Sequence, residues 1–169
     1  SLKGFDAASF TGSQSGIVTD ENHSEARIAD VRPFRLLPLL KGGAIAIVAG
    51  FQGVSRKGEI TTLGRGGSDT SAVALAVALG APQVNFYKDV PGIFSEDPKK
   101  NPAAVRLASL SYGKALELAE KGAKVLHQRS IALAAKNGVR LSVRSFTSPF
   151  EEGTVVGEGA VLCAEKSYE

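Results

Sequence analysis

Cysteine, methionine and histidine are scarce in this sequence, and their scarcity excludes several classes of function. Among the 169 residues there are one cysteine, two histidines and no methionine. A lone cysteine, Cys163, cannot form an internal disulfide, which suits a reducing cytoplasm. It has no basic neighbour beyond Lys166, so we interpret it as an incidental thiol rather than a nucleophile. Neither His23 nor His127 has a cysteine or carboxylate at ligand spacing, so we expect no protein-held metal, and we expect His127 to hydrogen-bond or pack locally near the start of a helix.

Long hydrophobic runs and blocks of like charge are also missing. No stretch approaches the about 20 consecutive apolar residues that span a membrane, and nothing resembles a signal peptide. The 20 basic and 17 acidic residues give a net charge of +3 and are spread along the chain. Because duplex binding usually needs a clustered basic face, a nucleic-acid partner is disfavoured and a phosphate-bearing small molecule fits better. With 43% hydrophobic residues the chain can bury one core, and the lack of methionine leads us to expect a piece of a longer protein.

The alternation of apolar runs with helical patterns predicts an α/β fold with layered αβα architecture. Residues 44–49 form a continuous apolar run between glycines, which is typical of a strand covered on both faces. Strands that alternate with helices indicate crossover connections, hence a mainly parallel sheet with helices on both sides. The expected helices are residues 68–79, 111–121 and about 125–137, and the other expected strands are residues 84–87, 141–145 with one polar face, and weak segments around 155–156 and 161–162.

Two stretches of the first half read as less regular. The first thirty residues are rich in serine, threonine, glycine and aspartate, and they indicate surface loops and short strands. A short helix is expected within residues 30–40. Pro38 is expected to cut or kink it, because proline lacks a backbone N–H donor.

The most informative segment combines residues 50–53 with residues 61–70. It reads as a strand, a glycine-containing loop and the start of a helix. Glycines allow a backbone to approach a ligand closely, and a helix N-terminus presents free N–H groups to anions. In layered parallel sheets, ligands bind outside the carboxyl ends of the strands, and the loops after Val48 and Tyr87 both fall at such ends. Both loops are therefore expected to lie where a ligand binds.

Simpler interpretations of the same loop remain open from the residues alone. Arg65 offers a planar fork for a carboxylate, but it can equally be solvated in a turn. Asp69 can act on a ligand, or it can cap the first turn of the helix. The common nucleotide motifs are absent, since there is no phosphate loop ending in Gly-Lys-Ser/Thr and Asp69 stands where a G-x-G-x-x-G pattern needs its last glycine.

The sequence resembles the aspartate kinase signature within the amino acid kinase family. The resemblance rests on VAGFQG at residues 48–53 and TTLGRGGSDT at residues 61–70. KDVPGIF at residues 88–94 with DPK at residues 97–99 is similar to the family's nucleotide loop, and GAKVLH at residues 122–127 to its later lysine motif. Arg144-Ser145 with Gly153-Thr154 is similar to the end of the catalytic domain. This resemblance implies an incomplete amino acid kinase (carbamate kinase-like) fold.

The resemblance also implies roles for individual residues. Arg65 is expected to hold the α-carboxylate of aspartate, and Asp69 to organise the reaction centre together with Lys124, which steadies phosphate charge. The remaining expected aspartate-binding residues are Phe51, Gly66, Gly67 and Ser68, and the expected ATP contacts are Lys88, Asp89, Phe94, Lys99, Lys124 and Val125. The chain differs from the commonest family pattern in having Lys88 for threonine, Phe94 for tyrosine and Lys99 for arginine.

The implied reaction is phosphoryl transfer from MgATP to the β-carboxylate of L-aspartate, the first step towards lysine, threonine and methionine. A carboxylate with a reference pKa of about 3.9 is already ionised at neutral pH, so positioning and charge neutralisation must supply the rate. ATP and aspartate are thus the implied small-molecule partners, with Mg²⁺ carried by the ATP phosphates. A cytoplasmic homo-oligomer is implied for the intact enzyme.

Two family features do not occur in this sequence. They are the early Lys-x-Gly-Gly segment that grips the transferred phosphate and the later regulatory ACT domains. We therefore interpret residues 1–157 as the C-terminal portion of a catalytic domain and residues 158–169 as a tail or linker, and we expect the isolated chain to phosphorylate aspartate negligibly. The alternatives are another amino acid kinase, such as uridylate or acetylglutamate kinase, and a non-catalytic nucleotide-binding module.

Overall fold

The computed structural model describes residues 4–158, within which fourteen helices and strands follow one another. In chain order they are β1 (Ala7–Phe10), β2 (Ile17–Thr19), β3 (Ile28–Val31), α1 (Leu36–Lys41), β4 (Ile45–Val48), β5 (Gln52–Ser55), β6 (Ile60–Thr62), α2 (Gly67–Leu79), β7 (Gln83–Lys88), β8 (Ser109–Leu110), α3 (Tyr112–Glu120), α4 (Gln128–Asn137), β9 (Arg140–Ser145) and β10 (Thr154–Val156). The weak strand expected around residues 161–162, and nearly all of the tail expected at residues 158–169, lie outside the described residues. None of the helices in residues 4–158 is long and apolar enough to cross a membrane.

The strands form three hydrogen-bonded sheets rather than one. Their orders are β1-β4, β3-β2-β5-β6 and β7-β9-β10-β8. The parallel pairs are β1 with β4, β2 with β5, β7 with β9 and β8 with β10, and the antiparallel pairs are β2 with β3, β5 with β6 and β9 with β10. The predicted α/β class with mainly parallel pairing is therefore confirmed. The predicted single sheet is not observed, because β4 and β7 belong to separate sheets and do not pair with each other.

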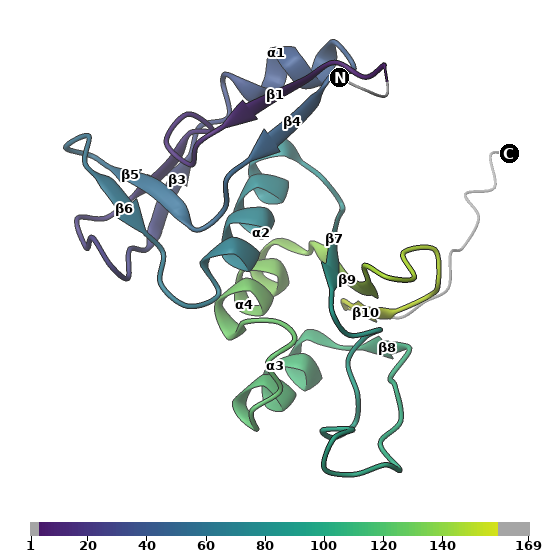
Figure 1. The fold of residues 1–169 in the computed structure, drawn as a ribbon. Helices are drawn as coiled ribbons and strands as arrows, with labels where there is room; N and C mark the ends of the chain where they lie inside the picture. The colour runs from purple at the N-terminus through teal and green to yellow at the C-terminus, as the bar shows by residue number, and fades with distance from the viewer. Residues whose placement is uncertain (1–3, 159–169) are drawn as a thin grey trace, which may run out of the picture.

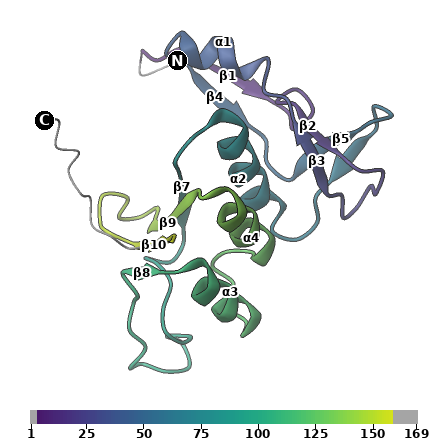
Figure 2. The ribbon, with the colours of Figure 1, turned by 180° about the vertical axis from the view of Figure 1, so that it is seen from behind.

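Helix α2 lies in the middle of the molecule. Figures 1 and 2 show it between the strands of the N-terminal half and the sheet that contains β7 and β9. Its last residue is followed by Gly80, whose φ of +68° allows the left-handed turn that ends the helix. The main core forms where α2, α3 and α4 meet β7 and β9, around the fully buried side chains of Val73, Ile131 and Leu141. The prediction of a buried helix over residues 68–79 is confirmed, with the start one residue earlier.

Side-chain caps fix the starts of α3 and α4. The Ser111 hydroxyl accepts a hydrogen bond from the Lys114 N–H, and the His127 ring accepts one from the Arg129 N–H. The predicted local role of His127 is thereby confirmed. Helix α4 begins at Gln128 rather than at Val125, because His127 is the capping residue and Leu126 before it is buried in the core.

Three predictions for individual elements are corrected. Strand β4 is not covered on both faces, since Ile45 is 47% exposed and Ile47 is 56% exposed. The polar face of β9 is present but only partly in contact with water, because Ser142 is buried and its hydroxyl accepts a hydrogen bond from Arg144 Nε at 3.2 Å. Pro38 does not cut α1, because it is the third residue of the helix, where the missing N–H would have no intrahelical partner.

Glu117 in α3 gives the fold a testable dependence on pH. Its carboxylate accepts hydrogen bonds from Lys114 Nζ at 2.8 Å and Lys121 Nζ at 2.6 Å, which lower the pKa of Glu117 from 4.5 to about 2. Because the pKa of Glu117 is lower in the folded chain than in the unfolded chain, the ionised carboxylate stabilises the fold at pH values above its unfolded-state pKa. This contribution is lost as the pH falls towards about 2. We expect Glu117→Gln to lower the thermal unfolding midpoint slightly at neutral pH, since the three side chains are largely exposed. Melting curves near pH 2 should show no difference, and an equal deficit at both pH values would contradict this origin.

Candidate functional site

A tight turn joins β6 to α2, and we call its residues 64–67 the glycine loop. Gly64 and Gly66 have φ values of +70° and +69°, which residues with a Cβ rarely adopt. The Gly67 N–H donates to the Gly64 carbonyl at 3.0 Å, and the Thr70 hydroxyl donates to the Gly66 carbonyl at 2.9 Å. The loop therefore runs straight into the first turn of α2, with Arg65 at its tip.

The glycine loop packs against two aromatic side chains that leave no room for a Cβ. A methyl group on Gly66 would lie 2.1 Å from Cγ of His127, which comes from the start of α4. A methyl group on Gly67 would lie 2.8 Å from Cδ2 of Phe51, in the turn after β4. Gly66 and Gly67, predicted to bind substrate, are thus also required for the loop to be seated between these two rings.

The turn after β4 contains a strained residue. Phe51 has a φ of +71°, which is unusual for any residue except glycine and a genuine outlier for an aromatic one. Two hydrogen bonds hold it there: its N–H donates to Ser71 Oγ at 3.0 Å, and its carbonyl accepts from the Leu63 N–H at 3.0 Å. Backbone strain of this kind clusters at ligand sites. Phe51 is still 41% exposed, so part of its ring is free to contact a ligand.

An ion pair joins the first turn of α2 to the end of β7. Lys88 Nζ lies 2.7 Å from Asp69 Oδ1, and only 15% of the Asp69 side chain and 28% of the Lys88 side chain are exposed. The Lys88 ammonium also lies 5.5 Å from the centre of the Phe86 ring. The end of β7 therefore lies beside the first turn of α2. The Asp69 carboxylate bonds Lys88 and does not cap the helix, so the capping interpretation is not supported.

Arg65 and Ser68 are the exposed polar side chains of the site. Within residues 4–158, neither side chain forms a hydrogen bond or ion pair. Gly50 lies directly against Ser68, because a Cβ on Gly50 would be 3.1 Å from the Ser68 Cα. One free guanidinium, one free hydroxyl and one paired carboxylate thus surround the N-terminus of α2.

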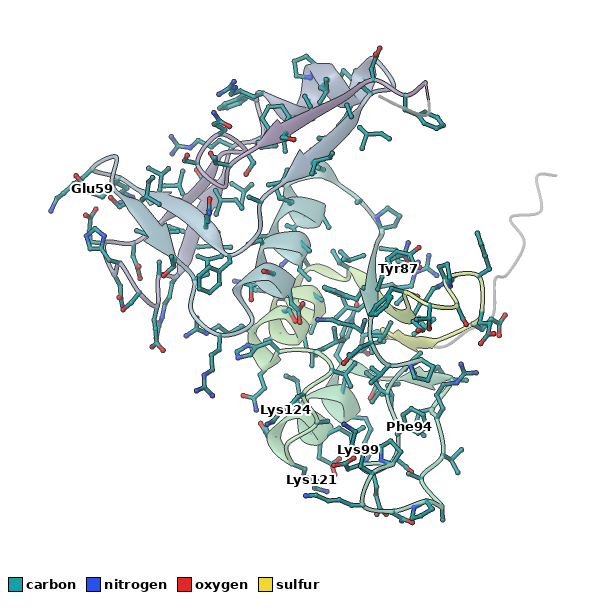
Figure 3. The ribbon with its side chains drawn as sticks, viewed as in Figure 1. Glu59, Tyr87, Phe94, Lys99, Lys121 and Lys124 are labelled. Carbon is teal, nitrogen blue, oxygen red and sulfur yellow. The ribbon has the colours of Figure 1, made fainter. Side chains whose placement is uncertain are left out.

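Apart from Lys88, the residues predicted to contact ATP lie on loops away from β5 and β6. Figure 3 shows Phe94, Lys99 and Lys124 around the loop between β7 and β8 and the loop between α3 and α4. Among the described residues, the side chains of Asp89, Lys99 and Lys124 have no hydrogen bond or ion pair, and all three are exposed. Phe94 is half-buried and forms a β-bridge with Arg106. Val125 packs against the core, so its backbone is more available to a ligand than its side chain.

Sequence reasoning missed two residues that hold this site together. Arg129 in α4 donates from Nη1 to the Leu63 carbonyl at 3.0 Å, directly before the glycine loop. Ser71 accepts from the Phe51 N–H and donates to the Gly67 carbonyl at 2.8 Å, so it links both turns. The position of Ser71 one helical turn after Gly67 was a usable signal, whereas nothing near Arg129 in the sequence indicates a contact with Leu63. No three His, Cys, Asp or Glu side chains in residues 4–158 are grouped to hold a metal ion.

The chain is similar to known proteins in sequence and in fold. Residues 2–145 match the profile described as the Amino acid kinase family. Aspartokinase 2 of Bacillus subtilis (strain 168) is 51% identical over 156 residues, which is 92% of this chain and 38% of that protein. An aspartokinase of Bacillus sp. (strain MGA3) is 49% identical over 160 residues, which is 95% of this chain and 39% of that protein. The crystal structure of E. coli aspartokinase III in complex with aspartate and ADP superimposes with a TM-score of 0.83 at 36% identity, covering 92% of this chain and 35% of that one.

The chain thus spans less than two fifths of the length of these relatives. The matched segment belongs to their N-terminal part, which corrects our expectation of a C-terminal portion. The sequence itself contains no feature that fixes its position within a longer chain, so only the comparison could provide it.

Proposed function

Because the chain belongs to the amino acid kinase family, we propose that it forms part of an enzyme that transfers the γ-phosphoryl group of MgATP to the β-carboxylate of L-aspartate. The product is 4-phospho-L-aspartate, the first intermediate towards lysine, threonine and methionine, made in the cytoplasm by a homo-oligomer. The observation that carries this proposal is the unpaired guanidinium of Arg65 on the glycine loop beside the Asp69–Lys88 pair. The similarity to an aspartokinase that binds aspartate and ADP supports the same substrates.

The aspartate substrate is held at the glycine loop. Arg65 has both of its terminal nitrogens free, so it can bind the α-carboxylate with two parallel hydrogen bonds. The Ser68 hydroxyl and the free N–H groups of the first turn of α2 add neutral donors, and the exposed part of the Phe51 ring covers the carbon chain. This arrangement leaves the β-carboxylate of the substrate directed away from Arg65.

Lys88 has a second role besides the ATP contact that the resemblance implies. One of its three N–H donors is used on Asp69, which fixes the orientation of that carboxylate. The other donors remain available to a phosphoryl oxygen. Because the substrate carboxylate is already ionised, no general base is needed, and Asp69 and Lys88 act by orienting the reactants and balancing their charge.

ATP is bound by residues on the loop between β7 and β8 and on the loop between α3 and α4. The free ammonium groups of Lys99 and Lys124 suit phosphate oxygens, and the Phe94 ring and the Val125 backbone suit the adenosine part. Mg²⁺ would enter on the ATP phosphates, and Asp89 is an exposed carboxylate able to bind it there. When bound, the ion neutralises part of the phosphate charge during transfer.

Calorimetry on this chain tests the proposal through Arg65. Aspartate titrated in the presence of saturating MgATP should release binding heat, and Arg65→Gln should weaken aspartate binding about 10- to 100-fold, the loss expected for charge-assisted hydrogen bonds. Arg140→Gln, which removes an exposed guanidinium from β9, serves as the matched control and should leave aspartate binding unchanged. Nucleotide binding without any aspartate heat would instead favour a non-catalytic nucleotide-binding module.

A further inference from the structure

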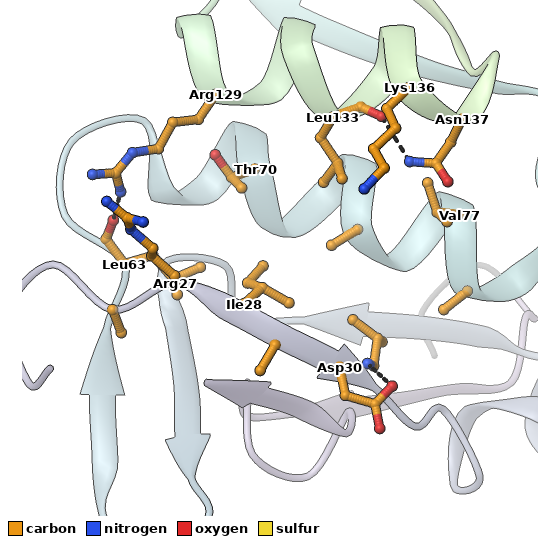
Figure 4. A pocket seen from close by; sticks show the side chains of 15 residues that line it. Arg27, Ile28, Asp30, Leu63, Thr70, Val77, Arg129, Leu133, Lys136 and Asn137 are labelled. Atoms are coloured by element: carbon orange, nitrogen blue, oxygen red, sulfur yellow. Dashed lines mark hydrogen bonds between the residues drawn. The ribbon is translucent and has the colours of Figure 1, made fainter. Parts of the chain in front are cut away.

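A groove separate from the glycine loop lies between β3, α2 and α4. Its volume is about 690 Å³, within the range of about 300–1,000 Å³ that small-molecule sites usually have. Its apolar wall consists of Ile28 from β3, Val77 from α2 and Leu133 from α4. Figure 4 shows these side chains facing the same space. The α2 residues that line the groove are Thr70, Ala74, Val77 and Ala78, which recur at helical spacing on one face.

Positive charge collects at one end of this groove. Arg27 and Arg129 both line it, and Figure 4 places their guanidinium groups at the same end, beside Leu63. Backbone contacts explain the convergence: the residue before Arg27 donates its N–H to the Thr62 carbonyl, and Arg129 bonds the next carbonyl, that of Leu63. Within residues 4–158, the Arg27 guanidinium has no hydrogen bond or ion pair, and Arg129 contacts only a neutral carbonyl through its side chain.

The acid in the groove does not balance these cations. Asp30 of β3 also lines the groove, but its carboxylate is already bound by Arg32 Nε at 2.6 Å. That contact holds the pKa of Asp30 below its usual value, so the carboxylate stays ionised and occupied. Lys136 from α4 adds a further ammonium group without a partner among the described residues. The groove therefore presents an apolar wall and an excess of unpaired positive charge.

We propose that this groove binds a small amphipathic anion, with a phosphate or carboxylate head between Arg27 and Arg129 and an alkyl body along Ile28, Val77 and Leu133. Two guanidinium groups at the same end of a groove repel each other, and an anion bound there can accept hydrogen bonds from both. An extended peptide paired to β3 fits less well, because the outward N–H of Val31 is already bound by Asp30 Oδ1 at 2.8 Å. The head site lies on a different face of α2 from Asp69, so the two sites do not share a ligand.

Octyl phosphate, used below its micelle concentration, tests the proposal by calorimetry on the chain. We expect it to bind, and we expect octyl glucoside, which has the same tail and no charge, and inorganic phosphate, which has no tail, each to bind at least about tenfold more weakly. Arg27→Gln should weaken octyl phosphate at least about tenfold, because it removes charge-assisted hydrogen bonds. Arg27 is chosen over Arg129 because Arg129 also supports the glycine loop.

Two further variants complete the design. Ala78→Phe adds a ring on the groove face of α2 and should also weaken octyl phosphate, whereas Arg140→Gln lies outside the groove and should not. If Ala78→Phe does not fold, Lys136→Gln at an exposed position replaces it. The proposal is overturned if octyl glucoside binds as well as octyl phosphate, or if Arg27→Gln binds octyl phosphate unchanged. Sedimentation provides a further test of whether a second copy of the chain occupies the groove. The proposal is also overturned if the chain self-associates, if octyl phosphate does not reduce this association, and if Arg27→Gln disrupts it.

Discussion

Replacing Gly66 by alanine is expected to lower the free energy of unfolding by about 4 kcal/mol and to abolish measurable aspartate binding. The first cause is backbone strain, because the φ of +69° is unfavourable for any residue with a Cβ. The second is a steric clash, since the new methyl group would lie 2.1 Å from Cγ and 2.3 Å from Cβ of His127. Rotation of the His127 ring does not move the Cβ of His127, so it cannot relieve the contact with the new methyl group. The start of α4 must therefore move. Urea denaturation measures the change in stability, and calorimetry measures aspartate binding.

Gly80 provides a control that separates the two causes. Its φ is +68°, but a Cβ there would have no heavy atom within 4 Å. Gly80→Ala therefore introduces the same backbone strain without the clash, and we expect a loss of only about 1 kcal/mol with aspartate binding preserved. Equal losses for the two variants would mean that the contact between the glycine loop and His127 contributes nothing.

The Asp69–Lys88 pair is expected to show strong energetic coupling. Removing one partner of a buried ion pair costs about 3–5 kcal/mol, and we expect about 2 kcal/mol for Lys88→Met or Asp69→Asn because the pair keeps some contact with water. The double variant should cost much less than the sum of the two, with a coupling energy of about 1–2 kcal/mol in a double-mutant cycle. Each single variant should also weaken aspartate binding, because Lys88→Met leaves the Asp69 carboxylate without a fixed orientation and Asp69→Asn removes its charge.

The Glu117–Lys121 pair in α3 is the matched control for this cycle. Its atoms lie 2.6 Å apart, close to the 2.7 Å of Asp69 and Lys88, but 43% and 69% of its side chains are exposed. Burial rather than distance should decide the outcome, so its coupling is expected to be close to zero. Similar coupling in the two pairs would contradict a special role for Asp69 and Lys88.

The helices could be predicted closely because their ends carry local signals. Gly80 and Gly138 follow α2 and α4 with positive φ values, and Ser111 caps α3, so each boundary depends on one residue and its neighbours in sequence. The start of α4 was predicted too early because an apolar run continued the helical pattern. Only the structure shows that Leu126 belongs to the core and His127 to the cap.

The strands of the first half were harder to predict because their pairing is decided by distant segments. The turn at Gly58 joins β5 to β6 in a hairpin that the sequence pattern did not reveal. Thr19 and Thr61 are polar and yet fully buried, because their hydroxyls bond each other at 2.7 Å across 42 residues. A pattern of apolar and polar residues cannot represent such a contact, since it treats both threonines as surface residues.

In the site, too, the features set by neighbouring residues could be predicted and those set by distant residues could not. The glycine loop, Arg65 and Asp69 could be recognised from neighbouring residues, and their placement at the start of a helix followed from the local pattern. The partner of Asp69 could not, because Lys88 is 19 residues away and nothing in the pattern says which loop cation reaches which acid. The support that Arg129 gives to Leu63, across 66 residues, was missed for the same reason.

Helix α2 has a consequence for how this chain can diverge in evolution. It contacts β3, β5, β7 and α4, and from Asp69 to Leu79 none of its residues is exposed. Apart from the face that lines the groove, a helix enclosed in this way has no surface on which side chains can vary freely in size. Away from the groove, divergence within α2 is therefore confined to side chains of similar size, whereas α3 and α4 each keep a stripe of solvent-facing positions where charge and length can drift.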